Sequence, residues 1–205
     1  MEEILLYFGI GLIILGYVVI FFAYMIFGNK KGKESGYDMA FRLLENDSGT
    51  KIVEGRDLLF SEYSIKRDAI RLSSRAYGNN DYFSLFVCSL LSGYALAKKC
   101  GSINIVSKLF KNYHFLSFSS ILTIIFSLLS NTISDAKVGV LLFCTILFYQ
   151  YLFFDYVNNA TLKVKSSIHN NSVVKILKLN VRVNILFMVA TLIELIRTFI
   201  IIFVR

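Results

Sequence analysis

The longest uncharged run in this chain limits its fold more than any other feature. It extends from Ile4 to Phe27 and contains only apolar residues, tyrosines and glycines. A helix that rises about 1.5 Å per residue covers roughly 36 Å over such a run, enough to cross a hydrocarbon core of about 30 Å. A cleaved signal peptide would begin with positive charges, whereas this run follows Glu2 and Glu3. We therefore predict an uncleaved membrane anchor over residues 1–28.

Three further segments have the length and composition of membrane spans. Residues 115–134 and 138–154 carry no charge, and the short polar stretch between them predicts a transmembrane hairpin over 114–157. Residues 183–205 supply the last predicted span. The uncharged run 83–97 is shorter, and its length is more typical of a buried or interfacial helix.

The last predicted span contains two charged residues, Glu194 and Arg197. A charge at membrane depth costs several kcal/mol unless it is paired. The i,i+3 spacing places both side chains on one face of a helix, where they can neutralise each other. We expect a membrane-embedded ion pair, either as a polar site inside the helix bundle or, the favoured interpretation, as an interhelical clamp near the membrane edge.

The positive charges are distributed very unequally around these spans. The chain has a formal net charge of +8, and 19 of its 22 lysines and arginines lie between the first and second spans or between the third and fourth. By the positive-inside rule, both long loops are predicted to be cytoplasmic and both termini to lie outside. The segment 158–182 is predicted to be a basic amphipathic cytoplasmic loop, whose part from Lys163 to Arg182 forms an amphipathic helix on anionic lipid headgroups. This distribution favours a lipid bilayer, and not nucleic acid, as the partner of the basic residues.

The overall composition excludes several classes of protein. Hydrophobic residues make up 56% of the chain and charged residues 18%, and there is no proline. Soluble domains average about 25% charged residues. A disordered, collagenous or disulfide-stapled chain is therefore excluded, and a soluble enzyme is disfavoured.

The cytoplasmic segment 29–113 is predicted to form a small α+β unit. Residues 36–47 have helical periodicity, with Ser35 or Asp38 as the cap. Two or three short strands are expected next, and they are followed by the helix 83–97. The expected strands are 51–53, 58–60 and 69–73.

This order of elements, together with several local strings, resembles the YugP-type membrane-bound neutral zinc metallopeptidases of bacteria. The string Ser35-Gly36-Tyr37-Asp38-Met39-Ala40-Phe41-Arg42-Leu43-Leu44 is similar to the family's T-G-x-E-v-A-r-x-l-L helix. Tyr63 followed by Ala69-Ile70-Arg71-Leu72-Ser73 resembles its Y-D-P and v-x-L-S strings, and Leu192-Ile193-Glu194-Leu195-Ile196-Arg197 resembles its closing span. The resemblance covers nearly the whole chain and implies a bacterial inner-membrane location.

The residues at the family's catalytic motif are different in this chain. The family binds zinc through H-E-x-x-H, two imidazoles at i and i+4 with a glutamate as general base. By the resemblance, Leu90 and Tyr94 occupy the histidine positions and Leu91 the glutamate position. The third ligand maps to Asp155, as a possible remnant. Because leucine offers zinc no lone pair, we expect neither zinc nor peptidase activity, and we interpret the chain as a pseudoprotease.

The cysteines and the histidines do not offer an obvious replacement for this site. Cys88 and Cys144 lie in apolar surroundings and are predicted to be buried free thiols. A substitute metal site would need Cys88, Cys100 and His114, but Cys88 is expected on nearly the opposite side of its helix from Leu90. His114 is interpreted as an interfacial anchor beside the second span.

These inferences combine into one prediction of fold and function. The fold class is mainly α and integral to the membrane, with four transmembrane helices and a small α+β metallopeptidase-like segment. The expected function is that of a binding or regulatory pseudoprotease without a cofactor, whose partner is a membrane protein or an active metallopeptidase relative. The alternatives are an active zinc peptidase with atypical ligands, or an accessory subunit of a transporter or channel.

Overall fold

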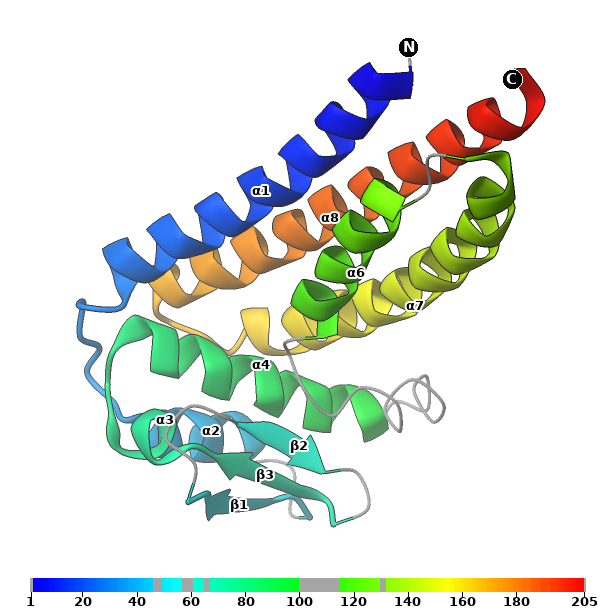
Figure 1. Ribbon diagram of the computed structural model, residues 1–205. Coiled ribbons are helices and arrows are strands. Elements are labelled where there is room, and N and C mark those ends of the chain that lie inside the picture. The colour runs from blue at the N-terminus through cyan, green and yellow to red at the C-terminus, as the bar shows by residue number, and fades with distance from the viewer. Residues whose placement is uncertain are drawn as a thin grey trace. The chain divides into compact units, whose positions relative to one another are not determined.

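The computed structural model describes residues 2–45, 49–56, 61–64, 67–99, 115–129 and 132–204 (Figure 1). The chain divides into two compact units. The first, here called the helical unit, comprises Met1–Ile20, His114–Phe154 and Arg182–Arg205. The second, the mixed unit, comprises Phe21–Tyr113 and Asp155–Val181.

The helical unit is built from parts of four helices. These are α1 (Glu2–Phe27), α6 (Phe115–Leu129), α7 (Ile133–Lys165) and α8 (Asn171–Val204). Large apolar side chains fill its centre, among them Ile13, Phe143 and Phe187. Many equally apolar side chains on the same helices are exposed, as expected for helices that face lipid.

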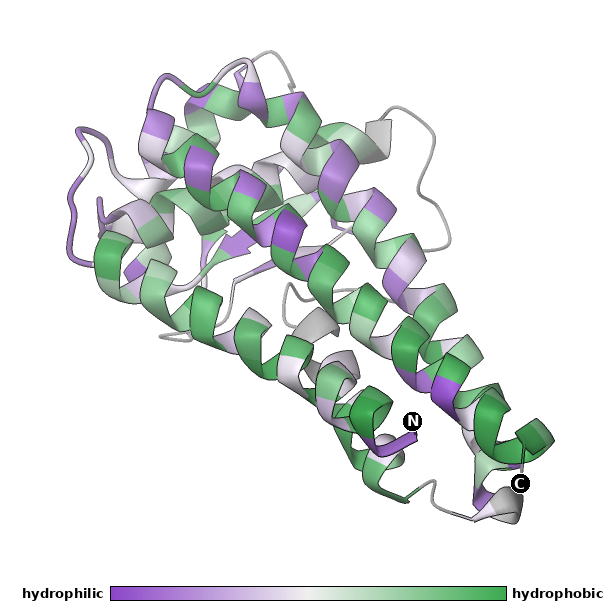
Figure 2. Ribbon diagram, turned by 90° about the horizontal axis from the view of Figure 1, so that it is seen from above, coloured by the Kyte–Doolittle hydropathy of each residue, from purple (hydrophilic) through white to green (hydrophobic). Residues whose placement is uncertain are grey.

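Three helices within the described residues are long and apolar enough to cross a membrane: Glu2–Phe27, Asp135–Lys165 and Asn171–Val204. In Figure 2, α1 is hydrophobic along almost its whole length. These helices contain three of the four predicted spans. Their length and composition are those of a membrane protein. The remaining predicted span, 115–134, corresponds to the 15-residue α6, which by itself is shorter than a typical span. Ser130 and Asn131 lie outside the described residues.

The boundaries of α7 and α8 differ from those predicted. The third span was expected to end at residue 154 and a basic loop to follow over 158–182, but α7 continues to Lys165 and α8 already begins at Asn171. The connection between these two helices is therefore short. Lysines and polar residues allow a helix to extend beyond its apolar part, and the apolar run alone does not mark where it ends.

The mixed unit contains a small sheet, the three helices α2, α3 and α4, and the adjoining ends of α1, α7 and α8. In chain order its elements are α2 (Gly36–Leu44), β1 (Lys51–Glu54), β2 (Glu62–Ser64), β3 (Ala69–Leu72), α3 (Ser74–Gly78) and α4 (Tyr82–Lys99). The strand order is β1-β3-β2, with β1 parallel and β2 antiparallel to β3. The predicted strands 51–53 and 69–73 are confirmed as β1 and β3. The third predicted strand, 58–60, lies outside the described residues.

The predicted amphipathic character of α2 is confirmed. Ser35 is the N-cap, and it forms a capping box with Asp38, whose carboxylate accepts from the Ser35 backbone N–H. Met39, Ala40 and Leu43 lie on the buried face. This face packs against α4, which also covers one side of the sheet (Figure 1).

Arg42 of α2 forms hydrogen bonds to two other segments of the mixed unit. Its guanidinium donates to both carboxylate oxygens of Glu34, at 3.1 and 2.8 Å. It also donates to the Ser167 carbonyl at 2.8 Å, in the connection between α7 and α8. The hydrogen bond to Glu34 raises the pKa of Arg42 above its ordinary value. Arg42 therefore ties α2 to a segment more than a hundred residues away.

Candidate functional site

Helix α4 carries Leu90, Leu91 and Tyr94, the residues predicted to occupy the positions of the H-E-x-x-H motif. Its N-terminus is fixed by Asp81, whose carboxylate accepts from the Ser84 backbone N–H at 2.9 Å and from the Ser84 hydroxyl at 2.8 Å. Beyond this cap, α4 runs through the core of the mixed unit.

The side chains at the three motif positions are enclosed by protein. Leu90, Leu91 and Tyr94 are 2%, 1% and 3% exposed. The Tyr94 ring stacks on the ring of Tyr156 in α7, with centroids 4.2 Å apart and planes 9° from parallel. Stacked aromatic side chains therefore fill the side of α4 where the second histidine of the family motif would project.

Gly93 explains how α4 approaches α7 so closely. A Cβ atom at this position would lie 2.5 Å from the carbonyl oxygen of Ala160 and 3.1 Å from its Cα. The two helices thus meet backbone to backbone at this point, as helices with small residues at their crossing commonly do. Neighbouring Ala95 and Ala160 are fully buried. No room remains beside Gly93 for a larger side chain.

The environment of Tyr94 is unsuited to proton transfer with solvent. Its hydroxyl is buried and has no hydrogen-bond partner among the described residues. Burial, with a smaller effect from Tyr156, raises the pKa of Tyr94 well above its ordinary value. The group therefore stays neutral and enclosed throughout the physiological pH range.

Asp155, predicted to lie at the position of the third ligand, does not join this cluster. Its side chain is exposed and accepts a hydrogen bond from Asn159 Nδ2 at 3.1 Å on the same helix. The adjacent residue, Tyr156, is the one that contacts Tyr94. Successive residues of a helix point about 100° apart, so the position that faces α4 falls on Tyr156.

The other candidate metal ligands are dispersed. Cys88 is fully buried, its thiol lies 3.5 Å from the Ala76 carbonyl, and burial raises its pKa. Cys144 was predicted to be buried, and this was wrong: it is exposed on α7. Cys100 and His114 lie outside the described residues. Within the described part of the chain, no three His, Cys, Asp or Glu side chains are grouped so that they could hold a metal ion.

No protein-family model, curated protein or solved structure matches this chain.

A buried polar centre lies within the helical unit. Arg197 Nε donates to Glu194 Oε2 at 2.8 Å, and the two residues are 2% and 0% exposed. A further Arg197 nitrogen donates to the Ser127 carbonyl of α6 at 2.7 Å. Gly9 of α1 makes space for the carboxylate, since a Cβ atom there would lie 2.5 Å from Glu194 Oε1. The pair therefore lies among three helices and makes interhelical contacts of the kind expected of a clamp.

Helix α6 carries a buried polar face that we did not predict from the sequence. Four hydroxyl-bearing residues on this 15-residue helix are buried: Ser119, Ser120, Thr123 and Ser127. Three of them are hydrogen-bonded to side chains of the other helices, namely Ser120 to Tyr17 at 2.8 Å, Ser119 to Gln150 at 3.2 Å and Thr123 to Thr191 at 3.1 Å. The signal in the sequence was their i,i+3 and i,i+4 spacing inside an otherwise apolar run.

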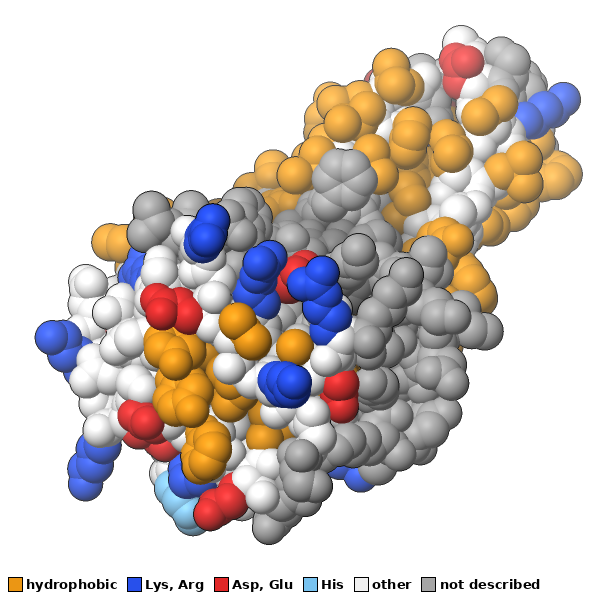
Figure 3. Space-filling view, turned by 90° about the horizontal axis from the view of Figure 1, so that it is seen from below, with side chains coloured by type: hydrophobic (Ala, Val, Ile, Leu, Met, Phe, Trp, Pro, Cys, Tyr) orange, Lys and Arg blue, Asp and Glu red, His pale blue; other side chains and the backbone are white. Residues whose placement is uncertain are grey.

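The surface of the mixed unit combines both signs of charge with an aromatic patch. Acidic and basic side chains are interspersed around apolar ones on the face seen in Figure 3. Tyr37 of α2 contacts both Phe41, with ring centroids 6.1 Å apart, and Tyr77 of α3, at 5.0 Å. Phe41 is 56% exposed. An exposed aromatic patch with a polar rim is typical of protein contact sites.

Proposed function

We propose that this chain is a four-span membrane protein whose mixed unit is a catalytically inactive, metallopeptidase-like binding module. The observation that carries this proposal is the packing around α4. Leu90, Leu91 and Tyr94 are buried, and Tyr94 stacks on Tyr156. Zinc peptidase chemistry requires metal ligands, an open coordination position and water, and this arrangement supplies apolar contacts in their place.

The family resemblance is supported by the order of elements in the mixed unit. Helix α2, which carries the family-like string beginning at Ser35, precedes three strands and then α4. The second family-like string, Ala69 to Ser73, covers β3 and the cap of α3. Helix α4 packs against both the sheet and α2.

Two other functions fit less well. A peptidase with atypical ligands would need Asp155 close to other metal ligands, but Asp155 is exposed and bonded to Asn159. A transporter or channel subunit would need polar groups that converge on a cavity. Several buried polar groups of the helical unit are hydrogen-bonded between helices, as with Thr123 and Thr191. Gln150 Oε1, Asn184 Nδ2 and Glu194 Oε1 are buried without a partner among the described residues, but the described groove in that unit is apolar and none of these three residues lines it.

Metal analysis of the full-length protein tests directly the proposal that it binds no zinc and has no peptidase activity. The protein is purified in detergent without chelators, and its zinc content and its proteolysis of an unfolded substrate are measured. We expect well under one zinc ion per chain and no proteolysis that a chelator removes. Stoichiometric zinc, lost together with a proteolytic activity on chelation, would contradict the proposal.

A reconstruction experiment tests the resemblance separately from the inactivity. The variant Leu90→His/Leu91→Glu/Tyr94→His/Tyr156→Glu restores the motif and places a carboxylate where α7 faces α4. If the mixed unit has metallopeptidase geometry, this variant binds zinc, whereas the matched variant with Tyr156 unchanged binds it at least tenfold more weakly. Protection of the buried Cys88 thiol from alkylation reports whether each variant is folded. A folded quadruple variant that binds no zinc would contradict the metallopeptidase-like geometry.

Crosslinking in native membranes tests the binding role. We expect a reproducible protein neighbour for the wild type and its loss in Phe41→Ser, which removes the exposed ring of the aromatic patch. The matched control is Val53→Ser, because Val53 is similarly exposed, at 48%, on β1. A wild type without a reproducible neighbour would argue against a binding function.

A further inference from the structure

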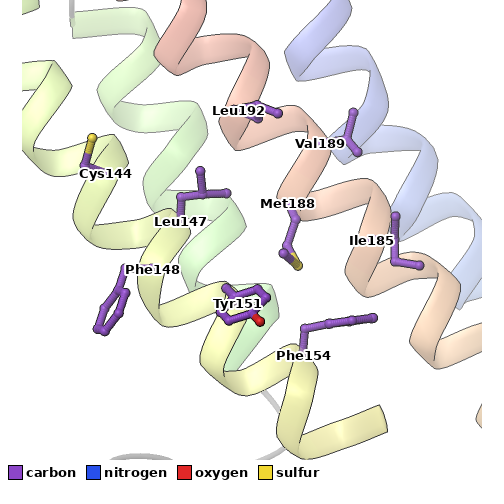
Figure 4. A pocket seen from close by; sticks show the side chains of 9 residues that line it. All are labelled: Cys144, Leu147, Phe148, Tyr151, Phe154, Ile185, Met188, Val189 and Leu192. Atoms are coloured by element: carbon purple, nitrogen blue, oxygen red, sulfur yellow. The ribbon is translucent and has the colours of Figure 1, made fainter.

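A groove runs between α7 and α8 on the surface of the helical unit. Its volume is about 540 Å³, and Figure 4 shows the side chains that line it. From α7 these are Cys144, Leu147, Phe148, Tyr151 and Phe154, and from α8 Ile185, Met188, Val189 and Leu192. The volume lies within the roughly 300–1,000 Å³ typical of small-molecule sites. The groove is therefore large enough for a discrete ligand.

The lining restricts the ligand to an apolar one. Apart from the Tyr151 hydroxyl and the Cys144 thiol, the lining side chains are hydrocarbon or thioether. Several are exposed along the groove, with Phe148 at 59%, Tyr151 at 58% and Leu192 at 44%. Both helices are long and apolar enough to cross a membrane. Hydrocarbon chains are accordingly the molecules that this groove meets at the highest concentration.

The groove is less suited to another helix than to an acyl chain. Two turns of an α-helix about 10 Å wide already fill roughly 850 Å³, more than the groove provides. Interfaces between transmembrane helices are also enriched in small residues that let backbones approach, whereas Phe148, Tyr151, Phe154 and Met188 are large. A long, thin and flexible apolar chain is the better fit.

Arg182 of α8 lies three residues before Ile185, the first residue of this helix that lines the groove. Arg182 precedes Ile185, Val189 and Leu192 at spacings of three, seven and ten residues, so that it lies on the same face of α8. Its side chain is exposed, and no carboxylate in the described part of the chain forms an ion pair with it. A guanidinium matches the geometry of a phosphate group, to which it can donate two parallel hydrogen bonds.

We propose that the groove between α7 and α8 binds one acyl chain of an anionic phospholipid, whose phosphate is held by Arg182. The apolar lining contributes the affinity for the chain, and the arginine contributes selectivity for the negative headgroup. This site belongs to the helical unit alone and is independent of the function proposed for the mixed unit.

Native mass spectrometry of the full-length protein tests the site. The protein is released from bilayers of equal parts phosphatidylglycerol and phosphatidylcholine, and the lipids retained per chain are counted by headgroup. We expect retained phosphatidylglycerol in the wild type. Val189→Trp, which fills the groove, abolishes this retention. Arg182→Gln retains lipid but lowers the preference for phosphatidylglycerol about fivefold, the effect of one basic residue near the membrane surface.

The matched control is Lys137→Gln, which removes a positive charge that is also exposed, near the start of α7, and leaves the lipid preference unchanged. Equal lipid retention by the wild type and Val189→Trp would overturn the proposal, as would an unaltered preference in Arg182→Gln. Crosslinking of Cys144 between two chains in the same bilayer, in a Cys100→Ser background, would instead identify the groove as an interface between copies and would also overturn it.

Discussion

Helices α4 and α6 are both buried and rich in hydroxyl groups, yet they use these groups differently. In α4, Ser89 and Ser92 donate to carbonyls four residues earlier in the same helix, at 2.7 and 2.9 Å. In α6, Ser119, Ser120 and Thr123 are bonded to side chains on three other helices. The Ser89 and Ser92 hydroxyls are therefore satisfied within α4. The hydroxyls of α6 also bond within their helix, as Thr123 and Ser127 do, but three of them connect the helices of their unit as well.

This difference shows what holds each unit together. Among the described residues, the serine hydroxyls of α4 make no bond to another helix, so the association of α4 with its neighbours depends on apolar surface and shape. In a bilayer the lipid tails are as apolar as leucine, so apolar contact contributes little net driving force and interhelical hydrogen bonds gain importance. The two units should accordingly respond differently to the loss of a polar group and to the addition of a methyl group.

The largest effect is expected from breaking the buried ion pair of the helical unit. Arg197→Met leaves the Glu194 carboxylate buried without its positive partner, and the Ser127 carbonyl loses its donor. Removing one partner of a buried pair costs about 3–5 kcal/mol. Unfolding of the full-length protein by SDS titration, followed by circular dichroism, measures the loss of free energy.

The double variant Glu194→Leu/Arg197→Met serves as the control for this prediction. It removes both charges together, so the unpaired buried carboxylate is absent and the loss should be clearly smaller than for Arg197→Met alone. An equal loss in the two variants would mean that the arginine acts through its size and not its charge.

A methyl group at the close contact between α4 and α7 tests the dependence on shape. The added Cβ in Gly93→Ala would lie 2.5 Å from the Ala160 carbonyl oxygen, and overpacking of this kind costs about 1–3 kcal/mol. Gly11→Ala in α1 is the matched control, because, apart from its chain neighbours and the nearby backbone of its own helix, no described atom lies within 4 Å of the added Cβ. That variant should be neutral, or stabilising by up to about 1 kcal/mol. Alkylation of Cys88 reports the opening of the mixed unit, and an unchanged rate in Gly93→Ala would contradict the close approach.

The hydroxyl of Tyr94 provides a test in the opposite direction. Tyr94→Phe keeps the stacked ring on Tyr156 and removes a buried hydroxyl that has no partner among the described residues. The cost of burying that group disappears, so the mixed unit should gain about 1 kcal/mol. Slower alkylation of Cys88 would show this gain. A loss of stability would show that the hydroxyl forms a bond in the membrane-bound protein.

Local patterns in the sequence predicted the elements whose stability is decided locally. The apolar face of α2 and its cap at Ser35 follow from spacing within one helix, and the long uncharged run from Ile4 predicts α1. The end of α7 at Lys165 did not follow in this way, because a helix can continue past its apolar part. That the segment 115–134, which contains α6, spans the membrane likewise stays a prediction.

The candidate site was predictable only in its composition. The replacement of imidazoles by Leu90 and Tyr94 is visible in the sequence, but the partner of Tyr94 is not. Which residue of α7 faces α4 depends on the rotation of that helix, and a shift of one residue separates exposed Asp155 from buried Tyr156. The contact of Gly93 with Ala160 joins residues 67 positions apart, and no local pattern encodes such a contact.

The smallest expected effect separates the two uses of hydroxyl groups. Thr191→Val removes the bond to Thr123 between α8 and α6 and leaves a buried hydroxyl with fewer partners. Interhelical bonds of this kind average about 0.6 kcal/mol in membrane proteins. Ser92→Ala removes only a bond to the carbonyl of Cys88 in the same helix, and that carbonyl keeps its helical N–H donor, so we expect a change close to zero. The same SDS titration and Cys88 alkylation measure both variants. Equal losses in the two would mean that the hydroxyls of α6 are as local in their effect as those of α4, and the contrast between the units would then rest on the ion pair alone.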